Sequence, residues 1–227
     1  MKQSKFSLQM PSGWVINGVN YRDRSDPIDL SQRLLEPRTQ DEFAKQRKGA
    51  KKDEFYVASM PFYHSFSTTL FDNKENKEFK NGIDEVRHFI KESMFKYWLG
   101  TLTRLRYNPK NKKDLMIHDY NQPQQRIIKL DSIVGPDSYI LKEDTKNVVK
   151  PLQAFLETRQ SLEEINNIYK WLTGTSNGAY LIRLNETPNE SLDTVARFYA
   201  NSDWAGLDCD GGPYYSVSAL GVRRANF

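Results

Sequence analysis

Residues 197–223 read RFYANSDWAGLDCDGGPYYSVSALGVR and decide the fold prediction for this chain. The segment contains no Lys, Glu, Gln or Met, although all four occur upstream. Within it, small or apolar residues alternate with glycine and with polar or aromatic residues. A period of two is typical of a β-strand with one packed face and one open face. The segment therefore predicts strands that divide its side chains between the interior and solvent.

The two sides of these strands differ in composition. The inward side is predicted to hold Ala205, Leu207, Cys209, Ser216, Ser218 and Leu220. The open side is predicted to hold Gly206, Asp208, Asp210, Tyr215 and Val217. Tyr, Asp, Gly, Val and Ser are all reached from an AAY asparagine codon when only its two adenines change, whereas Lys, Glu, Gln, Met and Trp are not. This pattern indicates that the solvent-facing side chains are randomised at adenines while the inward ones are held constant.

From 201–205 (NSDWA) to 218–223 (SALGVR) the segment resembles the variable region of the target proteins of diversity-generating retroelements, most closely the archaeal and archaeal-virus members. In that family a reverse transcriptase copies a template with adenine errors into the 3′ end of the gene, and the encoded protein displays the result on a C-type lectin fold. Arg197-Phe198 and Gly221-Val222-Arg223 resemble the constant borders of such a region. The resemblance implies a hypervariable protein that binds a ligand or receptor and is not an enzyme.

The resemblance also implies which side chains meet the ligand. The diversified contacts are expected to be Tyr199, Asp203, Gly206, Asp208, Asp210, Gly211, Gly212, Tyr214, Tyr215 and Val217, with Trp204 adjacent to them. Aromatic rings and short polar groups are also the chemistry of antibody loops. Arg223 is expected to make hydrogen bonds or an ion pair in the final strand. The ligand is expected to be a protein or a glycan, and display in several copies on a virion or cell surface would add avidity.

Two alternatives for the segment stay open. It could be a plain C-terminal β-hairpin, in which the Gly-Gly-Pro turn and the tyrosines are purely structural. The chain could also be a structural component of a virion or cell surface without a selectable ligand.

Composition and charge narrow the class of protein. The 227 residues are expected to form a single domain (1–227) with insertions, and the variable region lies at its C-terminal end. No apolar run approaches the roughly 20 residues that cross a bilayer, and no apolar stretch follows the basic residues of 1–13, so neither membrane insertion nor a secretory signal is expected. The net charge is +4, with a basic cluster at 45–52 that is expected to be a solvated helix end and loop. Acids outnumber bases after residue 185, so the working face would repel phosphate, and nucleic acid is not an expected partner.

Helices and strands alternate without a regular βαβ rhythm, which favours the α+β class. With the resemblance, the expected fold is a C-type lectin fold of the formylglycine-generating-enzyme-like variant, with a mixed, mainly antiparallel sheet and two or three helices. Capping boxes at Thr39/Glu42 and Ser161/Glu164 predict helix starts, and glycines 49 and 174 predict left-handed helix ends. An apolar stripe predicts a helix over 83–99. A short strand or a turn-rich entry is expected at 13–21, followed by a polar loop at 22–37 and by strand and extended loop at 53–71. Further strands are expected at 101–107, 115–117, 126–133 and 179–184.

Motifs that resemble catalytic or metal sites are incomplete. Residues 174–178 match G-x-S-x-G, but a helix is expected before Ser176 and a strand after it, the reverse of a hydrolase elbow. Asp208 to Gly212 resembles the opening of a calcium loop and lacks its later ligands. A lone Cys209 cannot form the cysteine pair of a formylglycine-generating enzyme and is expected to be a small core residue. His64, His88 and His118 lack metal-ligand spacing, and His88 is expected on a helix surface.

No catalytic residue, metal or cofactor is therefore expected. The alternatives kept are a formylglycine-generating-type enzyme, or a hydrolase, that uses Ser176, Cys209 or a histidine, and a carbohydrate-binding lectin of the same fold.

Overall fold

The computed structural model describes residues 7–9, 13–22, 24–142 and 146–224, and most of the N-terminal stretch considered for a signal lies outside these ranges. The described residues form an α+β structure, as predicted, but with five helices where two or three were expected. The helices are α1 (Gln40–Gly49), α2 (Met60–Asp72), α3 (Lys80–Lys96), α4 (Lys146–Leu156) and α5 (Leu162–Thr173).

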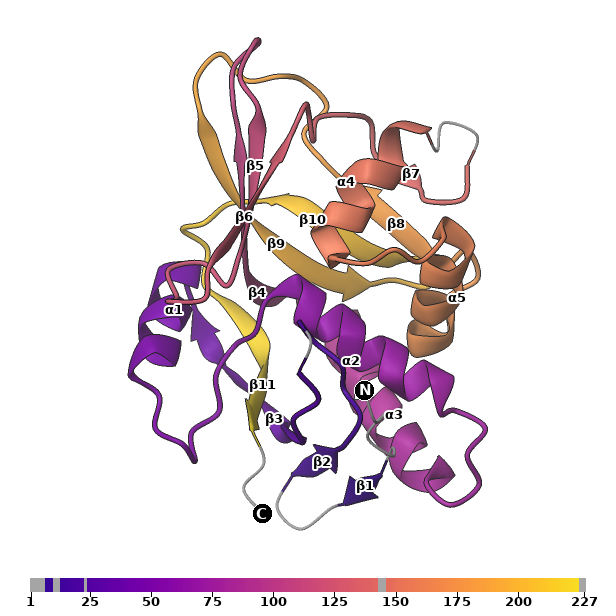
Figure 1. Cartoon of the computed structure of the whole chain (residues 1–227). Helices are drawn as coiled ribbons and strands as arrows, with labels where there is room; N and C mark the ends of the chain where they lie inside the picture. Colours follow the sequence, from indigo (N-terminus) through magenta and orange to yellow (C-terminus); the bar gives the residue numbers. More distant parts are fainter. Residues whose placement is uncertain (1–6, 10–12, 23, 143–145, 225–227) are drawn as a thin grey trace.

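The strands form two sheets (Figure 1). The first has the order β1 (Leu8–Gln9), β2 (Trp14–Ile16), β3 (Ile28–Arg38) and β11 (Val217–Arg224), and all its pairs are antiparallel. The second has the order β6 (Arg126–Leu130), β5 (Asp114–His118), β4 (Leu99–Tyr107), β9 (Leu192–Ala200), β10 (Ala205–Gly211), β8 (Ala179–Ile182) and β7 (Ser138–Tyr139). In this larger sheet all neighbours are antiparallel except β10 and β8.

The polar stretch 22–37 is not wholly a loop, because β3 occupies its second half. This strand pairs with β11 over a long register that runs from Arg38 opposite Val217 to Ile28 opposite Arg224. Its partner is almost the last segment of the chain. The pairing therefore depends on contacts that local sequence cannot report, and it brings the two ends of the chain together.

The prediction of strand and extended loop at 53–71 is wrong for its larger part, which forms α2. Aromatic and β-branched residues favour strands as an average tendency, but the apolar residues of this segment also recur at helical spacing. Met60, Tyr63, Phe66 and Leu70 are all buried. Pro61 lies in the first turn, where its missing N–H costs nothing, so it starts the helix instead of interrupting a strand.

Local helix signals were accurate at most positions. Both capping boxes are present, at Thr39/Glu42 and at Ser161/Glu164, and Gly174 ends α5 with φ 70°. Gly49 is the last residue of α1, but the capping residue after it is Ala50 in an extended conformation, so the left-handed end predicted there is wrong.

Two further features differ in part from the prediction. The apolar stripe of α3 is confirmed, although the helix ends at Lys96 and residue 99 already begins β4. The basic cluster is largely exposed, but Arg47 is half-buried and pairs with Asp119 at 2.7 Å.

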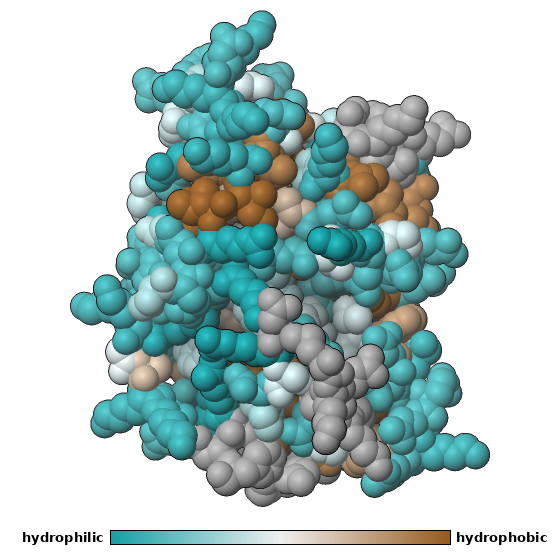
Figure 2. All heavy atoms as spheres, viewed as in Figure 1, coloured by the Kyte–Doolittle hydropathy of each residue, from teal (hydrophilic) through white to brown (hydrophobic). Residues whose placement is uncertain are grey.

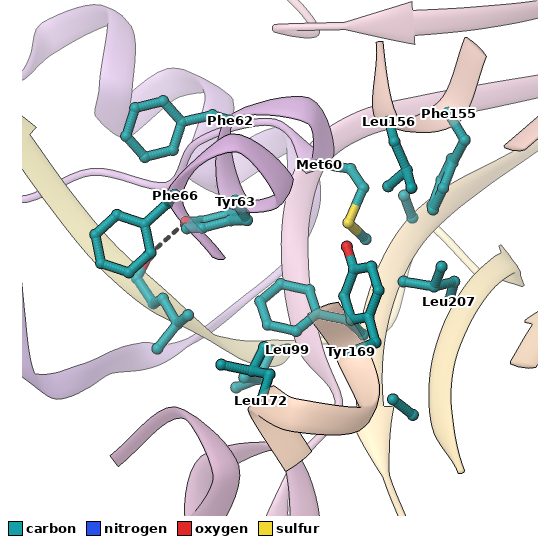
Figure 3. Packing of buried hydrophobic residues seen from close by; sticks show 14 of the residues in the cluster. Met60, Phe62, Tyr63, Phe66, Leu99, Phe155, Leu156, Tyr169, Leu172 and Leu207 are labelled. Carbon is teal, nitrogen blue, oxygen red and sulfur yellow. Dashed lines mark hydrogen bonds between the residues drawn. The ribbon is translucent and has the colours of Figure 1, made fainter. Parts of the chain in front are cut away.

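The main core lies between the larger sheet and the helices, and Figure 3 shows α2, α4 and α5 meeting β4 and β10 in it. Tyr63 of α2 donates its hydroxyl proton to the carbonyl oxygen of Leu220 in β11 at 2.6 Å, the dashed line in Figure 3, and so connects the helix to the smaller sheet. The face seen in Figure 1 is mostly hydrophilic, with hydrophobic patches in the region of β5 and β6 and near α4 and β7 (Figure 2).

Candidate binding face

Strand β10 carries the predicted alternation, and its inward side is confirmed. Ala205, Leu207 and Cys209 are buried in the main core. Leu207 lies near Phe155 and Leu156 of α4 in Figure 3. Cys209 is a core residue, as predicted, and burial raises the pKa of its thiol well above the usual value. The thiol is therefore protonated and packed, not a nucleophile.

The open side of β10 is only partly open. Gly206, Asp208 and Gly211 were predicted to face solvent, and all three are buried. The cause is that side chains of β9 lie across them. A Cβ on Gly206 would approach the Tyr199 ring to 2.8 Å, and a Cβ on Gly211 would approach Nε of Arg197 to 2.5 Å. Alternation predicts the side of a sheet on which a residue lies, and it does not predict whether the neighbouring strand covers that residue.

The other predicted contacts reach solvent to different extents. Tyr214 and Tyr215 are 88% and 69% exposed, and they belong to the loop of residues 212–216, which we call the Tyr214 loop. Asp203 and Asp210 are exposed as well. Tyr199, Trp204, Gly212 and Val217 are half-buried.

After the Tyr214 loop the chain leaves the larger sheet. β11 pairs with β3 and not with β10, so the Gly-Gly-Pro turn does not close a C-terminal β-hairpin, and this part of the plain-hairpin alternative is wrong. Ser216 is exposed and its predicted inward orientation is wrong, whereas Ser218 is half-buried and Leu220 is buried. Val217 lies directly over Gly100 of β4, where an added Cβ would be 2.7 Å from its Cγ2.

An open cleft of about 630 Å³ lies between the Tyr214 loop and the β4–β9 edge. It is lined by Arg106, Ser191, Leu192, Asp193, Thr194, Asp210, Gly212, Pro213, Tyr214 and Tyr215. Arg106 holds Asp193 with two hydrogen bonds of 2.6 and 2.9 Å, which lowers the pKa of that carboxyl. Asp210, Tyr214 and Tyr215 are exposed side chains that line the cleft.

A row of five rings crosses the same side of the sheet, and we call it the aromatic row. Its members, in order across β7, β8, the β9–β10 turn, β9 and the residue before β4, are Tyr139, Tyr180, Trp204, Tyr199 and Trp98. Successive ring centroids are 4.9, 4.7, 5.2 and 4.6 Å apart. Aromatic pairs at such distances add about 0.5–1.5 kcal/mol each beyond their buried area, so the row is a rigid platform.

Arg197 joins the aromatic row to the Tyr214 loop. Its guanidinium lies 5.4 Å from the ring centroid of Trp98 and 5.7 Å from that of Tyr215. Asp208 faces it directly across β9 and β10, and each residue is almost fully buried. Burial raises the pKa of Asp208 to about 7, with a further contribution from Asp210, while the Arg197 charge acts in the opposite direction.

The predicted contacts therefore fall at two places. Asp203, Trp204 and Tyr199 lie near the start of β10, whereas Asp210 lies near its end and the Tyr214 loop follows it. At the first place the carbonyl of Asp203 accepts a hydrogen bond of 2.9 Å from the N–H of Asn177, which anchors the β9–β10 turn to the loop before β8. The aromatic row and Arg197 connect the two places.

The final strand is fixed as expected by Arg223. Its Nε and Nη2 lie 2.8 and 2.7 Å from Oδ2 of Asp29 on the neighbouring strand β3. The guanidinium also lies over the ring of Phe55. Asp29 is buried, so the pair holds β11 in register with β3.

The incomplete catalytic motifs do not converge. Ser176 is exposed between α5 and β8, so a helix precedes it and a strand follows it, as predicted. His64 and His118 are buried, and burial lowers the pKa of each to about 4. His88 is on the exposed surface of α3, as predicted. Within the described ranges no group of three or more His, Cys, Asp or Glu side chains is placed to hold a metal.

Several residues of this face were missed from sequence, namely Trp98, Tyr139, Tyr180, Arg197, Arg106 and Asp193. All of them lie outside the alternating stretch 205–217. Their positions depend on strand pairing: Tyr180 is opposite Gly206, and Arg106 is opposite Asp193. The sequence offered one signal for this face, which was the group of aromatic residues around residue 98 at the end of an amphipathic helix.

Neither protein-family models, nor curated proteins, nor solved structures give a match to this chain. In the part of the chain that the structure covers, no helix has both the length and the apolar character needed to cross a bilayer.

Proposed function

We propose that this chain is a hypervariable ligand-binding protein that is diversified by a retroelement and displays variable side chains on a constant scaffold. The observation that carries the proposal is the division of side chains over 205–215. Leu207 and Cys209 are buried, whereas Asp210, Tyr214 and Tyr215 project into solvent. At these five positions the residues predicted to vary and the residues that maintain the core are separate, whereas the predicted variable positions Gly206, Asp208 and Gly211 are buried.

The C-type lectin fold is part of the same proposal. Support comes from the antiparallel pairing of β3, near the N-terminus, with the final strand β11. The second sheet then carries the variable segment in β9, β10 and the Tyr214 loop. The constant border at Arg223 is tied to β3 by an ion pair, so variation before it leaves the last strand in place.

The expected affinity of a single copy is modest. Four of the predicted ligand contacts are exposed, and three more, Tyr199, Gly212 and Val217, are half-buried. A standard protein interface uses about 20–30 residues a side. Aromatic anchors such as Tyr214 and Tyr215 add about 2 kcal/mol or more each where they fill a pocket of the partner, and display in several copies would add avidity.

The proposal is tested with two display libraries of equal size. One randomises Asp203, Asp210, Tyr214 and Tyr215, and the other randomises the exposed β4–β5 turn residues Lys110, Asn111, Lys112 and Lys113. Both are selected on the same two purified proteins, lysozyme and streptavidin. We expect specific binders mainly from the first library, with melting temperatures close to that of the parent.

Equal yields from the two libraries, or general unfolding of the first, would contradict the proposal. The gene offers an independent test. A near-copy of the coding region for residues 197–223, differing at adenines and lying beside a reverse transcriptase gene, is expected in the source genome. Its absence would contradict the retroelement part alone.

A further inference from the structure

Arg197 and Asp208 are two buried ionisable residues that face each other beneath the Tyr214 loop, with no ion pair or hydrogen bond between them. They are directly opposite in the register of β9 and β10, and only 4% and 0% of their surfaces are exposed. Buried charges are normally paired and fully hydrogen-bonded. Here Nε of Arg197 and Oδ2 of Asp208 have no hydrogen-bond partner, so the attraction between the two residues is not locked by a hydrogen bond.

The other atoms of Arg197 hold the Tyr214 loop. Its Nη2 donates a hydrogen bond of 2.7 Å to the carbonyl oxygen of Gly212. Its guanidinium lies between the rings of Trp98 and Tyr215. Gly211 leaves room for it, because a Cβ there would be 2.7 Å from Cζ of Arg197. The loop is therefore folded onto one side chain of a neighbouring strand.

Asp208 holds the start of the same loop. Its Oδ1 accepts a hydrogen bond of 2.8 Å from the backbone N–H of Asp210, two residues before the loop begins. Its carboxylate is also the charge nearest in register to Arg197. If the side chain at 208 is neutral, the guanidinium is left as an uncompensated buried charge, which favours its movement toward water.

We propose that position 208 determines ligand specificity indirectly, by selecting through Arg197 the conformation in which the Tyr214 loop is presented. This inference rests on the proposed function, because it assumes that the loop meets the ligand. Position 208 belongs to the set expected to vary at adenines. An aspartate at position 208 retains Arg197 under the loop, whereas serine or glycine removes the negative charge. A tyrosine side chain is too large for this buried position. Variation at position 208, which the ligand does not contact, thus changes the conformation of the Tyr214 loop, which the ligand does contact.

The experiment compares Asp208→Asn with Asp203→Asn in the full chain at pH 8, where Asp208 is above its pKa of about 7. Asp203 is a matched control because it is exposed and lies at the other end of β10. Chymotrypsin cleaves after accessible tyrosines, so the rate of cleavage after Tyr214 and Tyr215 reports release of the loop. We expect an increase of about tenfold for Asp208→Asn and little change for Asp203→Asn.

A second readout measures presentation instead of mobility. A nanobody is selected on the wild-type protein and mapped to Tyr214 and Tyr215, and a second one is mapped to the exposed turn between α2 and α3, which lies at the other side of the molecule (Figure 1). The Kd of the first is expected to weaken about tenfold for Asp208→Asn at a temperature where the variant is fully folded, while the second is unaffected. A purely structural role would change the melting temperature and neither Kd.

If Asp208→Asn does not fold, Arg197→Lys replaces it. This variant keeps the charge opposite Asp208 but lacks the planar guanidinium that stacks on the rings and reaches Gly212, so the same release of the loop is expected. Cleavage and Kd values within about twofold of wild type for both variants would overturn the inference, as would an equal effect of Asp203→Asn. The two proposals can fail separately. If the library selection fails but Asp208→Asn releases the Tyr214 loop, the proposed function is contradicted and the coupling of position 208 to the loop still holds.

Discussion

Trp98 and Tyr199 stack with their ring planes 8° from parallel and their centroids 4.6 Å apart. Trp98 directly precedes β4 and lies outside the predicted variable segment, whereas Tyr199 is a predicted variable position in β9. The Arg197 guanidinium lies 5.4 Å from the ring centroid of Trp98 and 5.7 Å from that of Tyr215. A ring from outside the predicted variable segment thus supports Tyr199, and we expect the order of the candidate binding face to depend on Trp98.

Replacement of Trp98 tests this dependence. We expect Trp98→Ala to lower the free energy of unfolding by about 2 kcal/mol, since it removes a stacked ring and a cation–π contact from a half-exposed site. Tyr97→Ala is the matched control, because Tyr97 is the neighbouring residue with similar exposure (50% against 46%). Urea unfolding measures both, and an equal loss in the two variants would show that the stack contributes nothing specific.

The two sides of β10 should respond differently to truncation. Leu207→Ala removes a fully buried side chain from the main core and is expected to cost about 2–5 kcal/mol. Asp210→Ala changes an exposed side chain three residues later and is expected to stay within about 0.5 kcal/mol of wild type. Thermal and urea unfolding of the pair measure the difference. Comparable losses would show that the outer positions maintain the scaffold and are not free to vary.

The features predicted correctly from sequence are those that short-range physics determines. The capping boxes at Thr39 and Ser161 need only a side chain and the next three residues, and the stripe of α3 needs only its own periodicity. β3 could not be predicted in the same way, because its partner β11 lies at the far end of the chain. α2 was mistaken because strand propensity was weighed above the helical spacing of Met60, Tyr63 and Phe66.

The same distinction holds for the candidate binding face. Alternation correctly placed Leu207 and Cys209 in the core and Asp210 outside. It failed at Asp208, because the covering side chain, Arg197, comes from another strand. The aromatic row was not predictable either, since its rings come from β7, β8, β9, the β9–β10 turn and the residue before β4, and they meet only through the sheet order.

Asp208 is expected to make stability depend on pH. Its pKa is about 7 in the folded chain, mainly through burial, against an ordinary value of 3.8. Between these values the folded state binds one more proton than the unfolded state, so the contribution of Asp208 to the free energy of unfolding falls as pH rises from about 4 to 7. Asp208→Asn cannot ionise and lacks this slope.

The measurement for Asp208 is urea unfolding of the wild type and of Asp208→Asn at pH 4.5, 5.5, 6.5 and 7.5. The variant should gain stability relative to wild type as pH rises. Taking the difference removes most contributions of other groups, although Asp210, Arg197 and Tyr199 surround the carboxyl and are coupled to it. A constant difference over this range would show that Asp208 titrates near its ordinary value.

His64 is expected to act with the opposite sign. It is buried in α2, with Nε2 2.7 Å from Oε1 of Gln160 and its ring stacked on Tyr169. Burial lowers the pKa of His64 to about 4, against an ordinary value of 6.5. Between these values the unfolded chain binds a proton that the folded chain does not, so stability is lost as pH falls from 6.5 toward 4.

His64→Gln removes this titrating group, so the free energy of unfolding should fall less steeply with decreasing pH than in the wild type, by about 1.4 kcal/mol per pH unit at most. His88→Gln, on the exposed face of α3, is the control and should retain the wild-type slope. A His64→Gln profile parallel to wild type would contradict the prediction, because it would mean that His64 binds its proton as readily in the folded chain as in the unfolded chain.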